Sequence, residues 1–387
     1  MENRKGIAPA VVGDIATVFV AIELSGKEWL LALQSPRQER ARRHKLPPAD
    51  AVGVWAVVER ERAALLRSGY CRARVVTCYE AGRDGFWLHR FLVAQGAESW
   101  VVDPGSVLVN RRARRAKSDR LDVEGLLRLA MRYDAGDRHL GRMVVVPSVS
   151  EEDARRPGRE RRRLLSERTA HNNRIQGLLA TQGIYDYRPL KADRRSRLAE
   201  LRCADGQPLP EHVHDEIVRE LHRLEFANAQ IAAVEKHRAA AIARAPGDDE
   251  AVQQLKALLR LRGFGMEFSS MLVREVYYRR FANRRGVASY VGLTASPFRS
   301  GTTDHDQGIA KAGNRRARST AIELAWLWLR HQPDSAFSHW FHARLGGSKS
   351  RRLKRILVVA LARKLVVALW RYLTTGLLPE GVRLKAA

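Results

Sequence analysis

Hydrophobic and polar residues follow two different spacings along the first third of the chain, and these predict strands and helices in turn. Strand-like runs cover residues 16–24, 29–33, 74–79 and 99–102, and the first two are expected to form a hairpin. Helical spacing of apolar residues covers residues 51–68, 86–95 and 119–132. Strands punctuated by helices indicate an α/β sheet, so we predict that residues 1–145 form one α/β domain.

Residues 146–248 differ from this first domain, because they are charged, helix-prone and poor in β-branched runs. One seam steps by four and three residues through Ile217, Leu221, Leu224, Asn228 and Ile231. This spacing is typical of a coiled coil, in which a lone polar residue such as Asn228 often fixes the register. The seam predicts a helical, coiled-coil middle domain. It leaves two partners open: a second copy of the chain, or another helix of the same chain.

Residues 249–387 are predicted to form a mostly helical third domain. Two helices flank the turn at Gly263 and Gly265, which resembles a helix-hairpin-helix whose backbone amides hold a phosphate. A plain turn between helices is the alternative for so short a signal. A strand-like piece over 290–294 and a loop over 296–308 come next, and helices rich in Trp, Leu and Val end the chain.

The formal net charge of +27, from 69 Lys and Arg against 42 Asp and Glu, points to a class of partner. Such an excess indicates a polyanion, and nucleic acid is favoured over a membrane surface because arginine forks match phosphate geometry. The most apolar segment, over residues 356–370, is interrupted by Arg363 and Lys364 and predicts a core helix rather than a membrane span. Three cysteines without metal or disulfide spacing, and no signal peptide, fit a protein of a reducing cytoplasm.

Several basic runs and loops are candidates for contact with nucleic acid. A solvated helix face is the plain explanation of any single run, but several runs along one chain make it less attractive. The candidate contacts are Arg111, Arg112, Arg114, Arg115, Lys117, Gly263, Gly265, Arg299, Lys311, Asn314, Arg315 and Arg316.

Four carboxylates stand in an order that indicates metal chemistry. Glu23 and Glu80 end two predicted strands, and Asp119 and Asp122 lie three apart on a predicted helix. Residues i and i+3 share one helix face, so the four acids can meet at one edge of the sheet. RNase-H-like nucleases collect Mg²⁺ ligands in this way, and phosphodiester chemistry often uses two such ions.

Each acid taken singly has a plainer explanation. Asp119 can cap its helix in competition with Ser118, Asp122 can pair with Arg120 or Arg128, and a strand can simply end in Glu. Clustered carboxylates repel one another, so burying four of them without a metal is unfavourable. The order, the strand placement and the paired aspartates together favour a joint metal site.

One serine, Ser300, precedes a glycine in the predicted loop over 296–308. A serine hydroxyl attacks phosphate when a base, a metal or nearby cations ease its ionisation. The cations available to stabilise a pentavalent phosphate are Arg299, Lys311, Arg315, Arg316 and Arg318. The alternatives are that Ser300 is an ordinary turn residue, or that Ser296, before Pro297, is the nucleophile.

At these residues the chain resembles transposases of the insertion-sequence-110 family, which also holds the 1111 type and resembles bridge-RNA-guided DNA recombinases. The resemblance covers most of the chain and rests on motifs in a fixed order. These are YEAG at 79–82, KSDRLD at 117–122, GFG at 263–265, YVGLT at 290–294, SG at 300–301 and KAGNR at 311–315. It implies an RNase-H or RuvC-like α/β domain at the start of the chain and a serine transposase domain at its end.

The resemblance also implies a role for each candidate residue. Glu23, Glu80, Asp119 and Asp122 would be a DEDD-type set of ligands for Mg²⁺ or Mn²⁺, and Ser300 would join covalently to DNA. A guide (bridge) RNA from the element's flank would pair with donor and target DNA, as in other guided systems. The protein would work as a homodimer or homotetramer. The family's first acid is usually Asp, so the extra methylene of Glu23 requires its carboxylate to retract or the metal to shift.

Three functions are therefore in view. The first is a DNA transposase or recombinase of an insertion sequence that cuts and rejoins DNA through a serine, with metal-binding carboxylates and an RNA guide. The second is a RuvC-like nuclease or junction resolvase that uses a metal-activated water, for which Ser300→Ala would be silent. The third is a decayed transposase that binds nucleic acid without catalysis.

Overall fold

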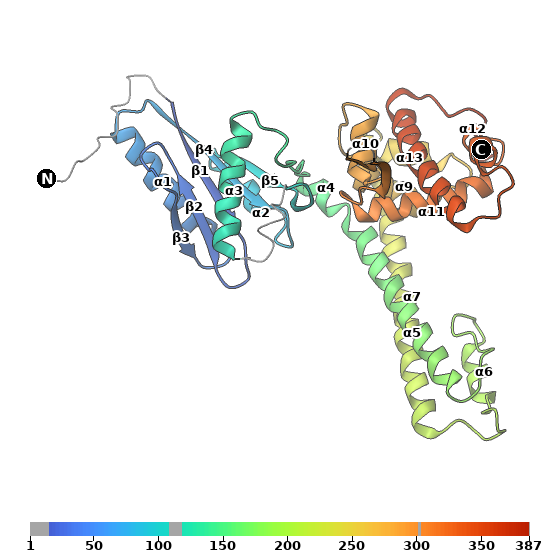
Figure 1. Cartoon of the computed structure of the whole chain (residues 1–387). Coiled ribbons are helices and arrows are strands. Elements are labelled where there is room, and N and C mark those ends of the chain that lie inside the picture. The colour runs from blue at the N-terminus through green and yellow to red at the C-terminus, as the bar shows by residue number, and fades with distance from the viewer. Residues whose placement is uncertain (1–14, 108–117, 301–302, 387) are drawn as a thin grey trace. The chain divides into compact units, whose positions relative to one another are not determined.

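The chain divides into two compact units, residues 1–146 and 147–387. The computed structural model describes residues 15–107, 118–300 and 303–386 (Figure 1). The first unit is built on a mixed β-sheet, and the second is helical apart from a β-hairpin. The second unit contains both segments that the sequence analysis separates at residue 248.

The first unit has every strand and helix predicted for it, with small shifts of their bounds. Its strands are β1 (Ile15–Glu23), β2 (Trp29–Gln34), β3 (Arg42–Leu46), β4 (Arg72–Glu80) and β5 (Glu98–Val102). Its helices are α1 (Ala51–Arg67), α2 (Trp87–Ala94), the short 3-10 turn η1 (Pro104–Ser106) and α3 (Asp119–Asp134).

The sheet has the order β3-β2-β1-β4-β5, with β1 antiparallel to β2 and parallel to β4. Alternate residues of a strand face opposite sides, and the core follows this rule. Val18, Val20 and Ile22 pack with α1 and α2 on one side, whereas Ala21 packs with α3 on the other. The predicted α/β domain is thus a sheet covered on both faces by helices (Figure 1).

Strand β3 was not predicted, because its sequence is Arg-Arg-His-Lys-Leu and carries no apolar alternation. It pairs antiparallel with β2 and is the edge strand of the sheet. Charged side chains on an edge strand discourage pairing with another chain. Because these side chains are charged, a search for alternating apolar residues does not detect such a strand.

The second unit begins with an arm of two long antiparallel helices (Figure 1). Its helices are α4 (Val149–Asp153), α5 (Arg156–Ala180), α6 (Arg194–Glu200) and α7 (Glu211–Arg244). Ile175 and Leu179 of α5 form a buried cluster with Leu198 of α6 and with the first part of the predicted seam on α7. This small core holds the far end of the arm together.

The seam residues on α7 pack against another helix of the same chain, which is the second of the two alternatives given above. Ile217, Leu221 and Leu224 are fully buried, and Ile231 is almost so. Ala227 is buried where the heptad pattern favoured Asn228, which is half-buried. The seam therefore packs on α5 as a helical hairpin and is not available as the contact between two copies.

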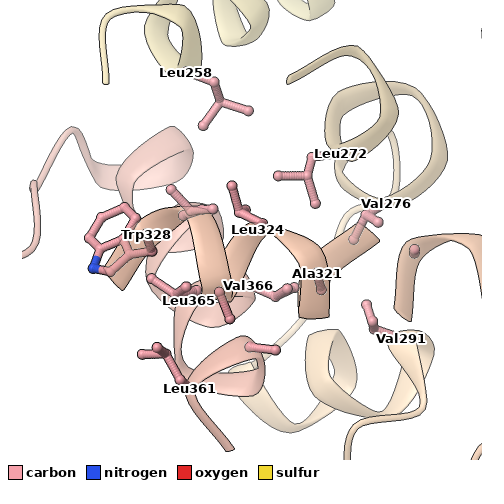
Figure 2. Close-up of a cluster of buried hydrophobic side chains, with 14 of the residues drawn as sticks. Leu258, Leu272, Val276, Val291, Ala321, Leu324, Trp328, Leu361, Leu365 and Val366 are labelled. Carbon is pink, nitrogen blue, oxygen red and sulfur yellow. The ribbon is translucent and has the colours of Figure 1, made fainter. Parts of the chain in front are cut away.

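The rest of the second unit is a helical body. Its elements are α8 (Glu250–Leu259), α9 (Met266–Leu272), the π-helix η3 (Val273–Tyr277), α10 (Arg284–Val291), β6 (Ala295–Ser300), β7 (Thr303–Ile309), α11 (Arg315–His331), α12 (Ala336–Leu345) and α13 (Arg351–Thr375). Figure 2 shows its core, in which Leu258, Leu272 and Leu324 lie near Trp328 and Leu365. The predicted core helix over 356–370 lies within α13. No described helix is long and apolar enough to cross a membrane.

Two predictions for this unit were wrong. The strand-like piece over 290–294 is the end of α10, whose buried Val287 and Val291 have helical spacing and which Gly292 stops in a left-handed conformation. The loop over 296–308 is the β6–β7 hairpin. Its second strand reads Thr-Asp-His-Asp-Gln-Gly-Ile, too polar for the hydrophobic pattern to reveal.

Candidate functional site

The two glutamates predicted to end neighbouring strands do so. The parallel register of β1 and β4 brings Glu23 level with Glu80 at the carboxyl ends of the two strands. Two residues earlier, Ala21 and Cys78 pack against α3. Strand alternation therefore directs Glu23 and Glu80 to that same face of the sheet. Glu23 is half-buried and Glu80 is exposed.

Helix α3 runs antiparallel to β4. Its last turn is tied to the start of the strand by Asp134, which accepts a hydrogen bond of 2.8 Å from Arg74. Its middle is tied to the end of the strand by the carbonyl of Leu126, which accepts a contact of 3.6 Å from the Cys78 thiol. The first turn of α3, with its two aspartates, therefore lies toward the edge where Glu23 and Glu80 end their strands.

The plainer explanations of the two aspartates do not hold in the structure. Ser118, not Asp119, is the N-cap of α3, and its side chain accepts a backbone hydrogen bond of 3.3 Å. Arg120 pairs with Glu124 at 3.3 Å rather than with Asp122. Neither aspartate forms an ion pair with a described residue. Both still complement the positive end of the helix dipole.

The four carboxylates are the kind of oxygen donors that Mg²⁺ prefers. Within residues 15–107, 118–300 and 303–386, however, no group of three or more His, Cys, Asp or Glu side chains is arranged to hold a metal ion. The backbone thus brings the three elements to one edge without the carboxylates converging. Binding a metal there would require the side chains to turn toward one another.

Negative charge at this edge also acts on a buried thiol. Cys78 is fully buried on β4, and burial together with the charge of Glu80 raises the pKa of this thiol to about 12. The thiol therefore stays protonated at neutral pH. The carboxylates remain the groups that carry negative charge at the carboxyl ends of β1 and β4.

Ser300 closes strand β6 and pairs with Thr303 at the tip of the hairpin. Its side chain, like Gly301 and Thr302, lies outside the described residues. Across the hairpin, Arg299 donates a hydrogen bond of 3.2 Å to Asp304, and both side chains are exposed. A strand pair, rather than the predicted loop, therefore presents Ser300.

The backbone after β7 is fixed by close packing. Lys311 has a φ of +56°, a left-handed conformation that is unusual for a residue with a side chain. Arg318 donates a hydrogen bond of 2.7 Å to the Lys311 carbonyl. A Cβ on Gly313 would lie 2.2 Å from the Tyr290 carbonyl, so only glycine fits. Asn314 then caps α11.

The cations predicted to meet phosphate separate into two groups. Lys311 and Arg315 are exposed and form no ion pair with a described residue. Arg316 is half-buried and donates to Glu275 at 3.1 Å, and Arg318 is held by backbone carbonyls. Burial lowers the pKa of both Arg316 and Arg318. Lys311 and Arg315 are therefore the better placed to meet a ligand.

A buried ion-pair cluster around Glu275, the Glu275 cluster, was missed from the sequence. Arg159 of α5 donates two hydrogen bonds of 2.9 and 3.0 Å to this carboxylate, and Arg316 adds a third. The Glu275 carbonyl accepts from the Tyr290 hydroxyl at 3.0 Å and from Asn314 at 3.4 Å. The cluster ties the arm to η3, α10 and the first turn of α11. No local pattern links residues so far apart in sequence.

The glycine turn has a packing explanation. Gly263 has a φ of +89°, and a Cβ there would lie 2.7 Å from the His331 Cβ. The backbone N–H groups of Arg262 and Phe264 donate to protein carbonyls. Gly265 is the N-cap of α9, a helix of only two turns. These features favour the plain turn between helices.

The arginine run before α3 lies outside the described residues. It comprises Arg111, Arg112, Arg114, Arg115 and Lys117. In sequence it leads directly to Ser118, the cap of the helix that carries the two aspartates.

Comparison with known proteins identifies the family of the chain. A family model described as Transposase IS116/IS110/IS902 family matches residues 255–340, the segment from α8 to α12 that includes the β6–β7 hairpin. The chain is 46% identical to the putative transposase y4rJ of Sinorhizobium fredii, over 99% of this chain and 98% of that protein.

More distant relatives carry similar names. A probable family 20 transposase of Pseudomonas aeruginosa is 28% identical, over 67% of this chain and 72% of its own length. The transposase for insertion sequence element IS1111A of Coxiella burnetii is 25% identical, over 76% of each chain. The chain therefore belongs to the IS116/IS110/IS902 family of transposases, enzymes that cut and rejoin DNA.

Proposed function

We propose that this transposase cuts DNA with the hydroxyl of Ser300 and uses Glu23, Glu80, Asp119 and Asp122 as ligands for Mg²⁺. The observation that carries the proposal is the placement of acids from three elements at one sheet edge. β1 and β4 end there in register on the face covered by α3, and the first turn of α3 lies toward the same edge. Its two aspartates form no ion pair with any residue that the structure describes.

Attack by Ser300 exchanges one phosphoester bond for another, so the energy needed to rejoin the DNA is kept in the protein–DNA bond. The Ser300 oxygen forms a bond to phosphorus as the bond to the departing DNA oxygen breaks, and the serine proton goes to that oxygen or to solvent. A hydroxyl from the strand to be joined then attacks the phosphoserine and frees Ser300. Lys311 and Arg315, exposed beside the hairpin in sequence, stabilise the charge of the pentavalent phosphate.

The carboxylates have a separate task. A bound Mg²⁺ would polarise phosphate oxygens and hold the reacting strand. Glu23 and Glu80 both end strands, and Glu23 stands where the family's first acid is usually Asp, so its extra methylene would change how its carboxylate reaches a bound ion. Mn²⁺ tolerates the same oxygen ligands.

We also propose that an RNA guide selects the DNA sites and that the active enzyme is a homodimer or homotetramer. The family resemblance supports both ideas, and the charge of +27 supports the first, since paired RNA and DNA offer a dense polyanion. The α7 seam is buried within the chain, so a contact between copies must use another surface.

The direct test is the covalent intermediate. Purified protein is incubated with RNA of the element's flank, its element-end DNA and Mg²⁺, quenched with denaturant, and examined for protein–DNA adducts. We expect an adduct with wild type and with Ser296→Ala, the matched control in the same strand, and none with Ser300→Ala. Binding of DNA by Ser300→Ala should persist.

Other results would assign another function. An adduct in Ser300→Ala that is lost in Ser296→Ala would move the nucleophile along β6. Cut DNA without any adduct, unaffected by Ser300→Ala, would indicate a nuclease that uses metal-activated water. Binding without any product from wild type would indicate a non-catalytic binder.

A further inference from the structure

The C-terminal part of the helical body contains a long stretch without acidic residues. Between Asp334 and Glu380 there is no Asp or Glu. The same stretch carries nine basic residues, and all nine are exposed. They are Arg344, Lys349, Arg351, Arg352, Lys354, Arg355, Arg363, Lys364 and Arg371.

These nine cations form no ion pair with any described residue. The arm of the same unit is different, because many of its arginines pair with acids. Arg174 pairs with Glu216 at 2.6 Å, and Arg195 pairs with Glu225 at 2.6 Å. The cations of α12 and α13 have no acidic partner among the described residues, and the like charges repel one another unless an anion neutralises them.

Several of these cations share one face of α13, a helix of 25 residues. Its inner face buries Leu361, Leu365 and Leu369 in the core. Arg352 and Arg363, eleven residues apart, fall on the opposite face by helical periodicity, and Arg371 extends the row. We call this row the α13 face. It spans roughly 28 Å, from nineteen residues at 1.5 Å each.

One apolar side chain accompanies the row: Ile356, four residues after Arg352, is 55% exposed. Lys354, whose ammonium lies 5.3 Å from the centre of the Trp326 ring, is about 200° around the helix from Arg352 and lies outside the row. A basic surface with exposed apolar side chains meets both the phosphates and the sugars of a nucleic-acid backbone.

We propose that the α13 face binds the phosphate backbone of duplex DNA. The partner follows from charge complementarity and from the family, whose members act on DNA, and it does not depend on which group performs the chemistry. A straight helix suits a duplex because its cations keep fixed spacing over nearly one helical turn of B-DNA, about 34 Å. Single-stranded RNA would instead favour aromatic stacking platforms, whereas the α13 face is mainly cationic.

The test is the salt dependence of DNA binding by the full chain. The triple variant Arg352→Gln, Arg363→Gln and Arg371→Gln is compared with the triple variant Arg40→Gln, Arg60→Gln and Arg67→Gln. The control residues are also exposed and unpaired among described residues but lie in the first unit. Affinity for a labelled duplex is measured by anisotropy over a series of KCl concentrations.

Neutralising three phosphates contributes roughly 2.7 to the slope of log affinity against log salt, at about 0.9 per phosphate. We expect the α13 triple to lose that much of the slope and at least about tenfold in affinity at low salt, and the control triple to lose neither. The matching Arg→Lys triple should keep most of the affinity, which separates lost charge from lost folding.

Three outcomes would overturn the proposal. Equal losses in both triples would show only an effect of net charge. An unchanged slope in the α13 triple would show that DNA does not contact this face. A loss confined to single-stranded RNA or to anionic lipid vesicles, with duplex binding intact, would assign the face to that partner instead.

Discussion

A single buried carboxylate, Glu275, joins parts of the second unit that are far apart in sequence. Its side chain is 6% exposed and meets Arg159 and Arg316, and its carbonyl meets Tyr290 and Asn314. Glu275 lies in the last turn before the C-cap at Tyr278, where helix carbonyls lack partners within the helix, so its carbonyl is open to side-chain donors. The cluster positions the loop that returns from the β6–β7 hairpin.

Acid should weaken the Glu275 cluster. Burial raises the pKa of Glu275, but the hydrogen bonds and charges of Arg159, with Arg316 and Arg155, lower it further, so it lies below its ordinary value of 4.5. A lowered carboxylate pKa contributes stability above the ordinary value, and that contribution is lost as pH falls through the folded pKa. The cluster should therefore weaken below about pH 4.5.

The variant Glu275→Gln isolates this effect. At pH 7 we expect it to lower the free energy of unfolding by about 2 kcal/mol, because two arginines lose a charged partner. The difference from wild type should shrink as pH falls below 4.5, measured by urea unfolding at each pH. A difference that stays constant down to acid pH would contradict the assigned charge of Glu275.

In contrast to Glu275, the aspartates of α3 are expected to matter for DNA cleavage and only slightly for stability. Asp119→Asn and Asp122→Asn break no ion pair among the described residues, so each should cost no more than about 1 kcal/mol, from the helix dipole, while DNA cleavage is lost. Glu124→Gln is the matched control on the same helix, because its carboxylate pairs with Arg120 and Arg43. It should keep cleavage. Full cleavage by either aspartate variant would remove the metal-site proposal.

At the scale of elements, the buried α7 seam holds the two long helices of the arm together. Leu221 is fully buried against α5, so Leu221→Ala should destabilise the protein by about 2–5 kcal/mol, as measured by urea unfolding. Phe226 lies on the same helix but is 67% exposed, and Phe226→Ala should change stability by less than about 0.5 kcal/mol. Dissociation of an oligomer by Leu221→Ala, without lower stability, would show that the seam joins two copies.

The sequence predicted elements wherever burial follows a short-range period. β1 alternates over its first part, β4 is a continuous buried run from Val75 to Tyr79, and α3 has both a serine cap and an apolar stripe. The prediction failed at β3 and at the β6–β7 hairpin, whose strands are polar and held by backbone pairing. It failed at 290–294 because Val291 and Leu293 suit either a strand or the end of a helix.

The candidate site was predictable only where it depends on local sequence patterns. Strand ends and an i, i+3 pair are local patterns, so the common edge of Glu23, Glu80 and α3 could be inferred before the fold was known. The Glu275 cluster could not, because Arg159 and Arg316 lie more than a hundred residues apart and only the tertiary fold brings them together.

At the scale of the whole molecule, the basic side chains behind the net charge of +27 differ in whether they form ion pairs. Many arginines of the arm, such as Arg174 and Arg195, are tied into ion pairs, whereas the arginines of α13 form no ion pair with a described residue. The chain thus separates cations that hold the fold from cations available to an anionic partner. Binding that weakens steeply with salt is the expected consequence.

The most direct measurement of the central claim is formation of the excised circular junction in cells that carry the element with its native flanks. Wild type, Ser300→Ala, Ser296→Ala and Glu80→Ala are compared by amplification across the junction, with protein levels matched. We predict junctions from wild type and Ser296→Ala, and none from Ser300→Ala or Glu80→Ala. Junctions from Ser300→Ala at the wild-type level would contradict a serine recombinase assisted by carboxylates.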